Sequence, residues 1–387
     1  MGAKVFFAPA KVKRMHQAYS LPAKLDRILR EQVDLRRIVG GKRTVIKVHL
    51  GEERIFTTVH PVLVRQVVSL VKEAGGQPIV VHSWGAVDAA TRGYSAETLG
   101  CPVLPMNGTT EKYYYPHPLP TDYPYLKEVY VSGEIQDAEA MVVITHVKGH
   151  GNTGMGAALK NVGIGMLAGP SRSWIHQQVA QIPYWNAEAC GSKQPCNTCL
   201  ESCPVEAIHW GGSNKDELHI DFHKCTFCNK CVEVCPANAL ALNADELYGS
   251  FQRAMALAAR EVLSTFEPGH VLYLNYLLNI TPWCDCHGFS TPSITKDVGV
   301  LVSEDPVAID QASFDLLKDA ELFEDMIPED FQTQFEGSIF QRFLGTAKDP
   351  EFQIREAAKL GLGSREYELV NVDDVLQPKE AELVAGH

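Results

Sequence analysis

The residues best suited to chemistry are cysteines, and eight of the eleven in the chain lie between Cys190 and Cys235. The second half of this stretch has the spacing C-x2-C-x2-C-x3-C-P, in which a tight turn brings three thiolates to one iron–sulfur cluster. In such a run the cysteine before proline reaches a second cluster. The residues are Cys225, Cys228, Cys231, Cys235 and Pro236. The run therefore predicts two 4Fe–4S clusters and a partner run elsewhere.

The partner run lies 32 residues upstream. It has the same C-x2-C-x3-C-P spacing and consists of Cys196, Cys199, Cys203 and Pro204. An internal repeat of this kind is typical of a two-cluster ferredoxin module. A zinc ribbon is the alternative, but it would need two separated C-x2-C pairs and would not explain the two prolines.

The repeat lacks one thiolate, because the residue 32 positions before Cys225 is Lys193. We expect Cys190 to supply it, since the stretch 191–195 contains glycine and proline and is able to loop out. Cys101, Cys284 or Cys286, a non-cysteine ligand or an open iron position are the alternatives. The expected ligands of the first cluster are Cys190, Cys196, Cys199 and Cys235, and those of the second are Cys203, Cys225, Cys228 and Cys231.

A second candidate site is a glycine-rich stretch that follows a predicted strand and leads into a predicted helix. It carries the basic residues His146, Lys148, His150 and Lys160. Backbone N–H groups at a helix N-terminus bind anions, and the carboxyl ends of strands form the usual binding edge of an α/β sheet. We predict a site for a small anionic substrate or cofactor here, although neither the dinucleotide motif nor the P-loop is present. The alternative is that the glycines only permit a tight turn and the histidines are structural.

A third candidate is the stretch Cys284-Asp285-Cys286-His287, which follows another predicted strand. Two cysteines with this spacing bind a metal ion or form a reactive dithiol whose thiolate is the active form. The alternative is a loop with two unreactive buried cysteines. Downstream, Asp305 precedes Pro306, and a helix N-cap accounts for this residue and its acidic neighbours.

The elements around these residues alternate between strands and helices. Strands are expected at 44–50, 78–82, 129–131, 141–145, 271–277 and 298–302, and helices at 61–74, at 245–264 and after Pro306. The helix at 61–74 begins with proline and is followed by glycine, and its predicted apolar face is Val62, Val64, Val67, Val68 and Val71. The stretch 93–125, rich in proline, glycine and tyrosine, is expected to be irregular.

This pattern predicts an α/β fold with an open, mixed or mainly parallel sheet. The host domain is expected to comprise residues 1–185 and 244–387. The residues between, 186–243, are expected to form an inserted ferredoxin-like α+β module, and we call them the cysteine-rich segment.

Charge and hydropathy exclude several classes of function. The chain of 387 residues has 35 basic and 47 acidic side chains, which gives a net charge of −12. Such a molecule is repelled by nucleic acids and anionic lipids. No secretion signal and no apolar run long enough for a membrane are recognisable, so we expect a cytoplasmic protein of anaerobic metabolism without disulfides.

Several motifs together resemble one protein family. They include Ile46 to Glu52, His146 to His150, Ala158 to Asn161, Cys284 to Cys286, and Asp305 to Asp310. These motifs are similar to those of the domain family of unknown function numbered 362, in its form with an inserted two-cluster ferredoxin module. The resemblance covers residues from about 42 to 372 and implies an iron–sulfur protein whose substrate is open. Lys193 departs from the pattern, since such proteins usually have a cysteine there.

The sequence therefore favours an iron–sulfur oxidoreductase. Two clusters would carry electrons to a substrate or cofactor site formed by His146, Lys148, His150, Lys160, Cys284 and Cys286, where a histidine would move the accompanying proton. A redox partner protein or another electron donor would supply the electrons. The alternatives are a non-catalytic ferredoxin-type carrier or docking subunit, and a redox or iron sensor.

Overall fold

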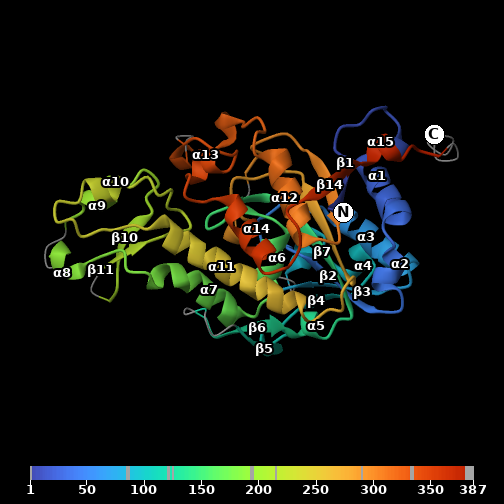
Figure 1. Cartoon of the computed structure of the whole chain (residues 1–387), viewed down its shortest axis with the longest axis horizontal. Helices are drawn as coiled ribbons and strands as arrows, with labels where there is room; N and C mark the ends of the chain where they lie inside the picture. The colour runs from blue at the N-terminus through green and yellow to red at the C-terminus, as the bar shows by residue number, and fades with distance from the viewer. Residues whose placement is uncertain are drawn as a thin grey trace.

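An eight-stranded sheet crosses the centre of the molecule in the computed structural model (Figure 1). The structure describes residues 2–83, 88–119, 123, 126–191, 196–213, 216–288, 291–331 and 335–379. The strand order is β14-β1-β13-β12-β7-β2-β3-β4. The strands are β1 (Ala3–Pro9), β2 (Arg43–Val48), β3 (Gln77–His82), β4 (Val103–Pro105), β7 (Ala140–His146), β12 (Val271–Leu277), β13 (Gly299–Ser303) and β14 (Tyr367–Asn371). Only β13 is antiparallel to its neighbours. The predicted mixed, mainly parallel α/β sheet is confirmed.

Helices cover both faces of this sheet. In β7 every residue is buried, and alternate side chains enter two different apolar cores, with Val143 in one and Val142 in the other. The core that contains Val142 is covered by α1 (Leu21–Arg27), α2 (Leu35–Val39), α3 (Pro61–Glu73) and α4 (Ala96–Leu99). The other is covered by α6 (Ala158–Gly163), α7 (Gly169–Gln181), α11 (Ala244–Leu263), α12 (Pro306–Leu317) and α14 (Pro350–Lys359).

The helix α3 confirms its predicted bounds and corrects its predicted apolar face. Proline lies in the first turn, and Gly75 beyond the last turn has a positive φ of 88°. Val64, Val67, Val68 and Val71 are buried, but Val62 is 61% exposed. The four buried valines follow the spacing i, i+3, i+4 and i+7, and a residue two positions before the first of them lies on the opposite side of the helix.

Residues 93–125 contain more regular structure than expected. Besides α4 and β4 they contribute β5 (Tyr114–Pro118), which pairs with β6 (Glu128–Ser132) in a separate hairpin. The predicted strand at 129–131 therefore exists but lies outside the main sheet. The prediction failed because β4 has only three residues and β5 contains two prolines, so neither has an alternating apolar pattern.

The cysteine-rich segment projects from one end of the molecule, beyond the ends of α7 and α11 (Figure 1). It consists of α8 (Ala187–Cys190), α9 (Thr198–Glu201), β10 (Ile208–Gly211), β11 (Glu217–Ile220) and α10 (Lys230–Glu233). The helices α9 and α10 begin 32 residues apart, and Glu206 and Asn238, also 32 apart, both have a φ of 48°. The internal repeat of the sequence is therefore a repeat of backbone conformation. The domain boundaries at 186 and 243 stay a prediction.

The remaining α-helices and strands are short. They are α5 (Gly133–Gln136), the hairpin of β8 (Lys148–His150) and β9 (Gly154–Gly156), α13 (Gln341–Leu344) and α15 (Val372–Val375). Within the described residues, no helix combines the length and hydropathy that crossing a membrane requires.

Candidate functional site

The carboxyl ends of β2, β3, β7 and β12 meet at one edge of the main sheet, because these strands run parallel to one another. His49 follows β2, and His82 and His146 end β3 and β7. The loop after β12, residues 281–288, carries Cys284 and Cys286, and we call it the C-x-C loop. The sheet thus brings side chains from four strand ends to one place, as is usual for binding sites in open α/β sheets.

Cys284 and Cys286 form a hydrogen-bonded pair. The Cys284 side chain is fully buried, and its Sγ lies 2.8 Å from the Sγ of Cys286, which is exposed. The thiol of Cys286 donates to Cys284, and together with the Lys160 ammonium this lowers the pKa of Cys284 well below its usual value. The same bond and the neighbouring negative charge raise the pKa of Cys286. The pair therefore holds one proton and one negative charge, and that charge lies on the buried sulfur.

Lys160 is the cation nearest to this thiolate. It extends from α6, is buried, and places its Nζ 3.5 Å from the Sγ of Cys284. Burial alone would lower the pKa of Lys160. The adjacent Cys284 thiolate has the opposite effect, and on balance the pKa of Lys160 is raised above its usual value. The structure thus brings together three of the predicted site residues, Lys160, Cys284 and Cys286.

Asp285, between the two cysteines, points into the protein and binds two other predicted residues. Its Oδ2 lies 2.9 Å from the Nδ1 of His146 and 3.2 Å from the Nζ of Lys148. The Nζ of Lys148 also donates to the backbone oxygen of His146 at 2.7 Å. Burial alone would raise the pKa of Asp285, but His146 and Lys148 lower it far below its usual value. Asp285 is therefore a buried carboxylate that fixes both basic side chains.

His146 has no ring nitrogen left for a substrate. Its Nε2 lies 3.0 Å from the backbone oxygen of Asn279, and its Nδ1 faces Asp285. Both partners are acceptors, so only the doubly protonated ring donates both bonds. His146 therefore positions Asp285 and the loop after β12, and the proton-transfer role expected of a histidine is not accessible to it in this arrangement.

Three further groups at this edge were missed by the sequence analysis. The rings of His49 and His82 lie 4.8 Å apart between centroids, and burial lowers the pKa of His49 to about 3 and that of His82 well below its usual value. Lys47 in β2 is fully buried and donates to the Oδ1 of Asn161 at 3.1 Å. His49 and His82 lie at or next to the carboxyl end of a predicted strand, a signal that was present in the sequence, whereas Lys47 lies in the middle of the predicted strand 44–50.

His150 lies apart from the cysteine pair and faces the cysteine-rich segment. Its ring is fully buried, with its centroid 4.9 Å from that of His223, and its Nε2 has no hydrogen-bond partner among the described residues. Burial lowers the pKa of His150 well below its usual value. The predicted basic cluster therefore divides, with His146, Lys148 and Lys160 around the C-x-C loop and His150 against His223.

The predicted anion site at the start of α6 is wrong in one respect. The backbone N–H groups of Ala158 and Leu159 already donate to the carboxylate of Asp310, each at 2.8 Å. Burial raises the pKa of this carboxyl to about 6. The protein's own side chain fills the helix N-terminus, which leaves only the lysines to bind an external anion. The predicted N-cap at Asp305 is confirmed, since it accepts from the backbone of Val307 and Ala308.

The cysteines of the cysteine-rich segment follow the same repeat as its backbone. Cys203 and Cys235 each accept a backbone N–H at 3.2 Å, from Ala207 and Ala239 respectively. Cys225 accepts one from residue 227 at 3.4 Å. Backbone N–H groups aimed at sulfur stabilise a thiolate. Lys193, whose place in the repeat prompted the choice of Cys190, lies outside the described residues.

The cysteines of this segment influence one another electrostatically. Burial and the charges of Cys225, Cys203, Cys228 and Cys199 raise the pKa of Cys231 to about 12. Burial also raises the pKa of Cys199, and the cysteine charges that add to it are those of Cys190 and Cys196. The neighbours of Cys199 belong to its expected ligand set, whereas Cys231 has neighbours from both sets. Among the described residues, no group of three or more His, Cys, Asp or Glu side chains is arranged to hold a single metal ion.

The cysteine-rich segment contacts the C-x-C loop through His223. The centroid of the His223 ring lies 4.4 Å from that of His287 and 5.2 Å from that of Trp283. The ammonium of Lys348, from the other side, donates to the backbone oxygen of His223 at 2.9 Å. Because Cys225 is only two residues further along the chain, one end of the cysteine run lies close to the loop that carries Cys284 and Cys286.

A family model described as a domain of unknown function, DUF362, matches residues 44–315, about two thirds of the chain. The chain belongs to the DUF362 family. The match includes every residue of the candidate site and the whole cysteine-rich segment. The motifs of DUF362 that suggested the family, His146 to His150, Ala158 to Asn161 and Cys284 to Cys286, are those that surround the buried thiolate and carboxylate. A comparison with curated proteins gives no match.

Two solved structures overlap with this DUF362 chain. One is the lactate racemase apoprotein from Thermoanaerobacterium thermosaccharolyticum, with 11% identity and a TM-score of 0.37, covering 79% of this chain and 54% of that chain. The other is a protein from Thermotoga maritima, with 9% identity and a TM-score of 0.35, covering 90% of this chain and 60% of that chain. The DUF362 chain thus spans less than two thirds of either structure, and overlap this loose supports no inference about activity.

Proposed function

We propose that this protein is an iron–sulfur oxidoreductase in which two 4Fe–4S clusters pass electrons to a substrate bound at the C-x-C loop. The observation that carries the proposal is the contact of His223 with His287 and Trp283. It joins the segment with the cluster-type cysteine spacing to the loop with the buried thiolate. An electron-transfer module that had no substrate site in this chain would not require this contact.

The cysteines fit such clusters in three respects. Their spacing is that of bacterial two-cluster ferredoxins. N–H groups point at the sulfurs of Cys203, Cys225 and Cys235, and the cysteine neighbours of Cys199 belong to its expected ligand set. Cys190 would supply the eighth thiolate, because it is an electrostatic neighbour of Cys199. When bound, the clusters supply one-electron transfer.

The residues of the C-x-C loop would bind and orient the substrate. The Cys284 thiolate is buried between Lys160 and the solvent-facing Cys286. Asp285 is the partner of Lys148 and His146, so Lys160 is the cation left to face the thiolate. Cys286 is the exposed residue of the pair, and its thiol holds the proton that the pair shares.

The test is anaerobic iron and acid-labile sulfide analysis with EPR of the dithionite-reduced protein, for the wild type and for Cys284→Ser/Cys286→Ser. We expect about eight iron and eight sulfide in both, because two four-iron clusters use only the cysteine-rich segment. About twelve iron, or loss of an EPR signal in the double variant, would show that Cys284 and Cys286 ligate a cluster and that the proposed substrate site contains iron. Absence of iron from the anaerobic protein would refute the proposal.

A ferredoxin-type carrier or docking subunit is the second candidate, and the projection of the cysteine-rich segment from one end of the molecule favours it (Figure 1). A carrier would reduce partner proteins equally well with and without Cys284 and Cys286. An oxidoreductase would lose turnover in the double variant while its clusters keep their EPR signals. The two candidates therefore differ in one measurement on one variant.

A further inference from the structure

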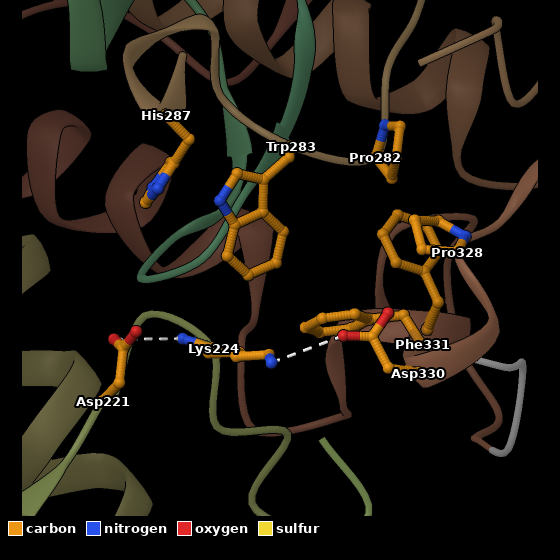
Figure 2. Close-up of a pocket in the computed structure, with 9 residues that line it drawn as sticks. Asp221, Lys224, Pro282, Trp283, His287, Pro328, Asp330 and Phe331 are labelled. Atoms are coloured by element: carbon orange, nitrogen blue, oxygen red, sulfur yellow. Dashed lines mark hydrogen bonds and ion pairs between the residues drawn. The ribbon is translucent and has the colours of Figure 1, made fainter. Parts of the chain in front are cut away.

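A cavity of about 420 Å³ lies where the cysteine-rich segment meets the C-x-C loop (Figure 2). Four separate stretches of chain line it, and the lining residues are Asp221, Lys224, Pro282, Trp283, His287, Pro328, Asp330, Phe331 and Phe343. Its volume is in the range of sites for small organic ligands, and the junction of two chain regions is a common position for such sites.

The walls of the cavity are aromatic and fixed by packing. Trp283 and Phe331 are 9% and 8% exposed, with ring centroids 5.1 Å apart and planes at 61°. The Trp283 ring also contacts His287 at 5.3 Å. Pro282 and Pro328 add two rigid apolar surfaces. Figure 2 shows the indole of Trp283 extending from its loop toward Lys224 and Phe331. Because the two rings stand at 61° to each other, a planar ring stacks on one of them and meets the edge of the other.

The polar groups of the cavity carry a net negative charge. Asp221 accepts the backbone N–H of residue 223 at 3.0 Å, which fixes its carboxylate beside Lys224. The Nζ of Lys224 lies 3.4 Å from the Oδ2 of Asp330, and both side chains are partly exposed. The lining thus carries two carboxylates and one ammonium, which is already paired with Asp330, and this balance disfavours an anionic ligand.

We propose that this cavity binds an uncharged planar aromatic molecule, with its ring against Trp283 and Phe331 and its polar edge toward Lys224 and His287. The proposal rests on the proposed function, whose substrate class it names. Lys224 directly precedes Cys225, and His287 directly follows Cys286. A ring in this cavity would therefore lie between the cysteine run and the cysteine pair.

The test uses lumiflavin, an uncharged tricyclic ring whose fluorescence is quenched by tryptophan, and FMN, the same ring system with a phosphate. We expect saturable quenching of lumiflavin by the wild-type chain, and affinity for FMN at least about threefold lower because of the two carboxylates. Trp283→Leu should weaken lumiflavin binding by about tenfold, and Phe331→Leu by a smaller factor. Trp283→Phe should retain most of the affinity.

Trp174 provides the matched control, since it packs on Tyr130 away from the cavity. Trp174→Phe should leave lumiflavin binding unchanged. Asp330→Asn should reduce the difference between the affinities for FMN and for lumiflavin. The proposal is overturned by unsaturable quenching, by equal binding in the wild type and the Trp283 and Phe331 variants, or by tighter binding of FMN than of lumiflavin.

Lumiflavin binding is measured both on protein stripped of iron and on protein reconstituted with iron and sulfide. Binding to the reconstituted protein is the test of the cavity, because Asp221 and Lys224 belong to the segment that iron removal is expected to loosen. Iron and sulfide content tests the clusters alone. If lumiflavin binds but the protein holds no iron, the proposed function has failed. If iron and sulfide are present but lumiflavin does not bind, the proposed cavity ligand has failed.

Discussion

At the scale of single residues, the site is defined by where two negative charges are buried. One lies on Cys284 and faces Lys160, and the other lies on Asp285 and faces Lys148. Buried charges persist only when they are paired, so each cation is tied to its own anion. Cys284 and Asp285 are adjacent in the sequence, so the two anions lie side by side, and each faces a different lysine.

Removing the charge of Lys160 should make the cysteine pair harder to ionise. Lys160→Met takes away an ammonium 3.5 Å from Cys284 and should raise the pH of half-maximal alkylation at residues 284 and 286 by about one unit or more. Lys160→Arg is the control and should keep the pH of half-maximal alkylation as low as in the wild type. The measurement is iodoacetamide labelling against pH, with mass spectrometry of the peptide 281–288. An unchanged profile in the methionine variant would mean that Lys160 does not stabilise the thiolate.

Asp285 should make stability depend on pH in a defined direction. Its pKa is lower in the folded chain than in the unfolded chain, so its contribution is present above about pH 4 and is lost as the pH falls toward its folded pKa. Asp285→Asn should cost about 3–5 kcal/mol at pH 7, because it leaves Lys148 buried without its carboxylate. Urea unfolding at pH 7 and pH 3 is the measurement, and a cost that does not shrink at pH 3 would contradict the ion pair.

At the scale of elements, the glycine-rich turn serves close packing more than anion binding. A side chain added at Gly149 would overlap the backbone oxygen of Pro282, and one at Gly151 would overlap His223. The turn is thus the surface against which the C-x-C loop and the cysteine-rich segment both pack. The helix N-terminus that follows is filled by Asp310.

Two glycines of this turn should therefore respond differently to the same substitution. Gly151→Ala forces His223 and its backbone to move and should destabilise the protein by about 1–3 kcal/mol. Gly156→Ala is the matched control, because its nearest neighbour would be at an ordinary 3.6 Å and the cost should stay within about 0.5 kcal/mol. Thermal unfolding of both variants is the measurement, and equal midpoints would refute the packing argument.

At the scale of the whole molecule, the main sheet is complete without the cysteine-rich segment. Its strands come from before residue 186 and after residue 243, and β12 pairs with β7 across that interval. The contacts between the two parts include those of His223 and a hydrogen bond from the Tyr184 hydroxyl to the backbone oxygen of Leu218. Stability should therefore differ between the sheet and the segment.

Removing iron should separate the two parts in an unfolding experiment. Chelation takes away the bonds that would connect the eight cysteines, so residues 186–243 should exchange their amide hydrogens at least about tenfold faster while β7 and β12 keep their protection. Hydrogen exchange with peptide resolution is the measurement. A loss of protection throughout the sheet would instead support the sensor alternative, in which cluster loss changes the whole fold.

Much of the fold could be predicted from local sequence patterns. The strands β2, β3, β7, β12 and β13, the helices α3, α11 and α12, and the 32-residue repeat follow from apolar spacing and turn residues that lie close together in the sequence. Three strands were not predicted: the edge strand β4, which has only three residues, and the edge strand β14 with its neighbour β1, which pair with each other from opposite ends of the chain. The site residues at positions 146, 148, 160, 284 and 286 were found because their types stand out at strand ends.

The sequence by itself determined which residues carry chemistry, because cysteine spacing and basic residues after strands are local features. Only the tertiary structure decided their partners. It directed Asp285 to Lys148 and Cys284 to Lys160, assigned Asp310 to the start of α6, and brought Trp283 to Phe331. The physical reason is that the strengths of a buried ion pair, a helix cap and a ring contact depend on distance in space. That distance is set by the order and direction of strands, which no local pattern encodes.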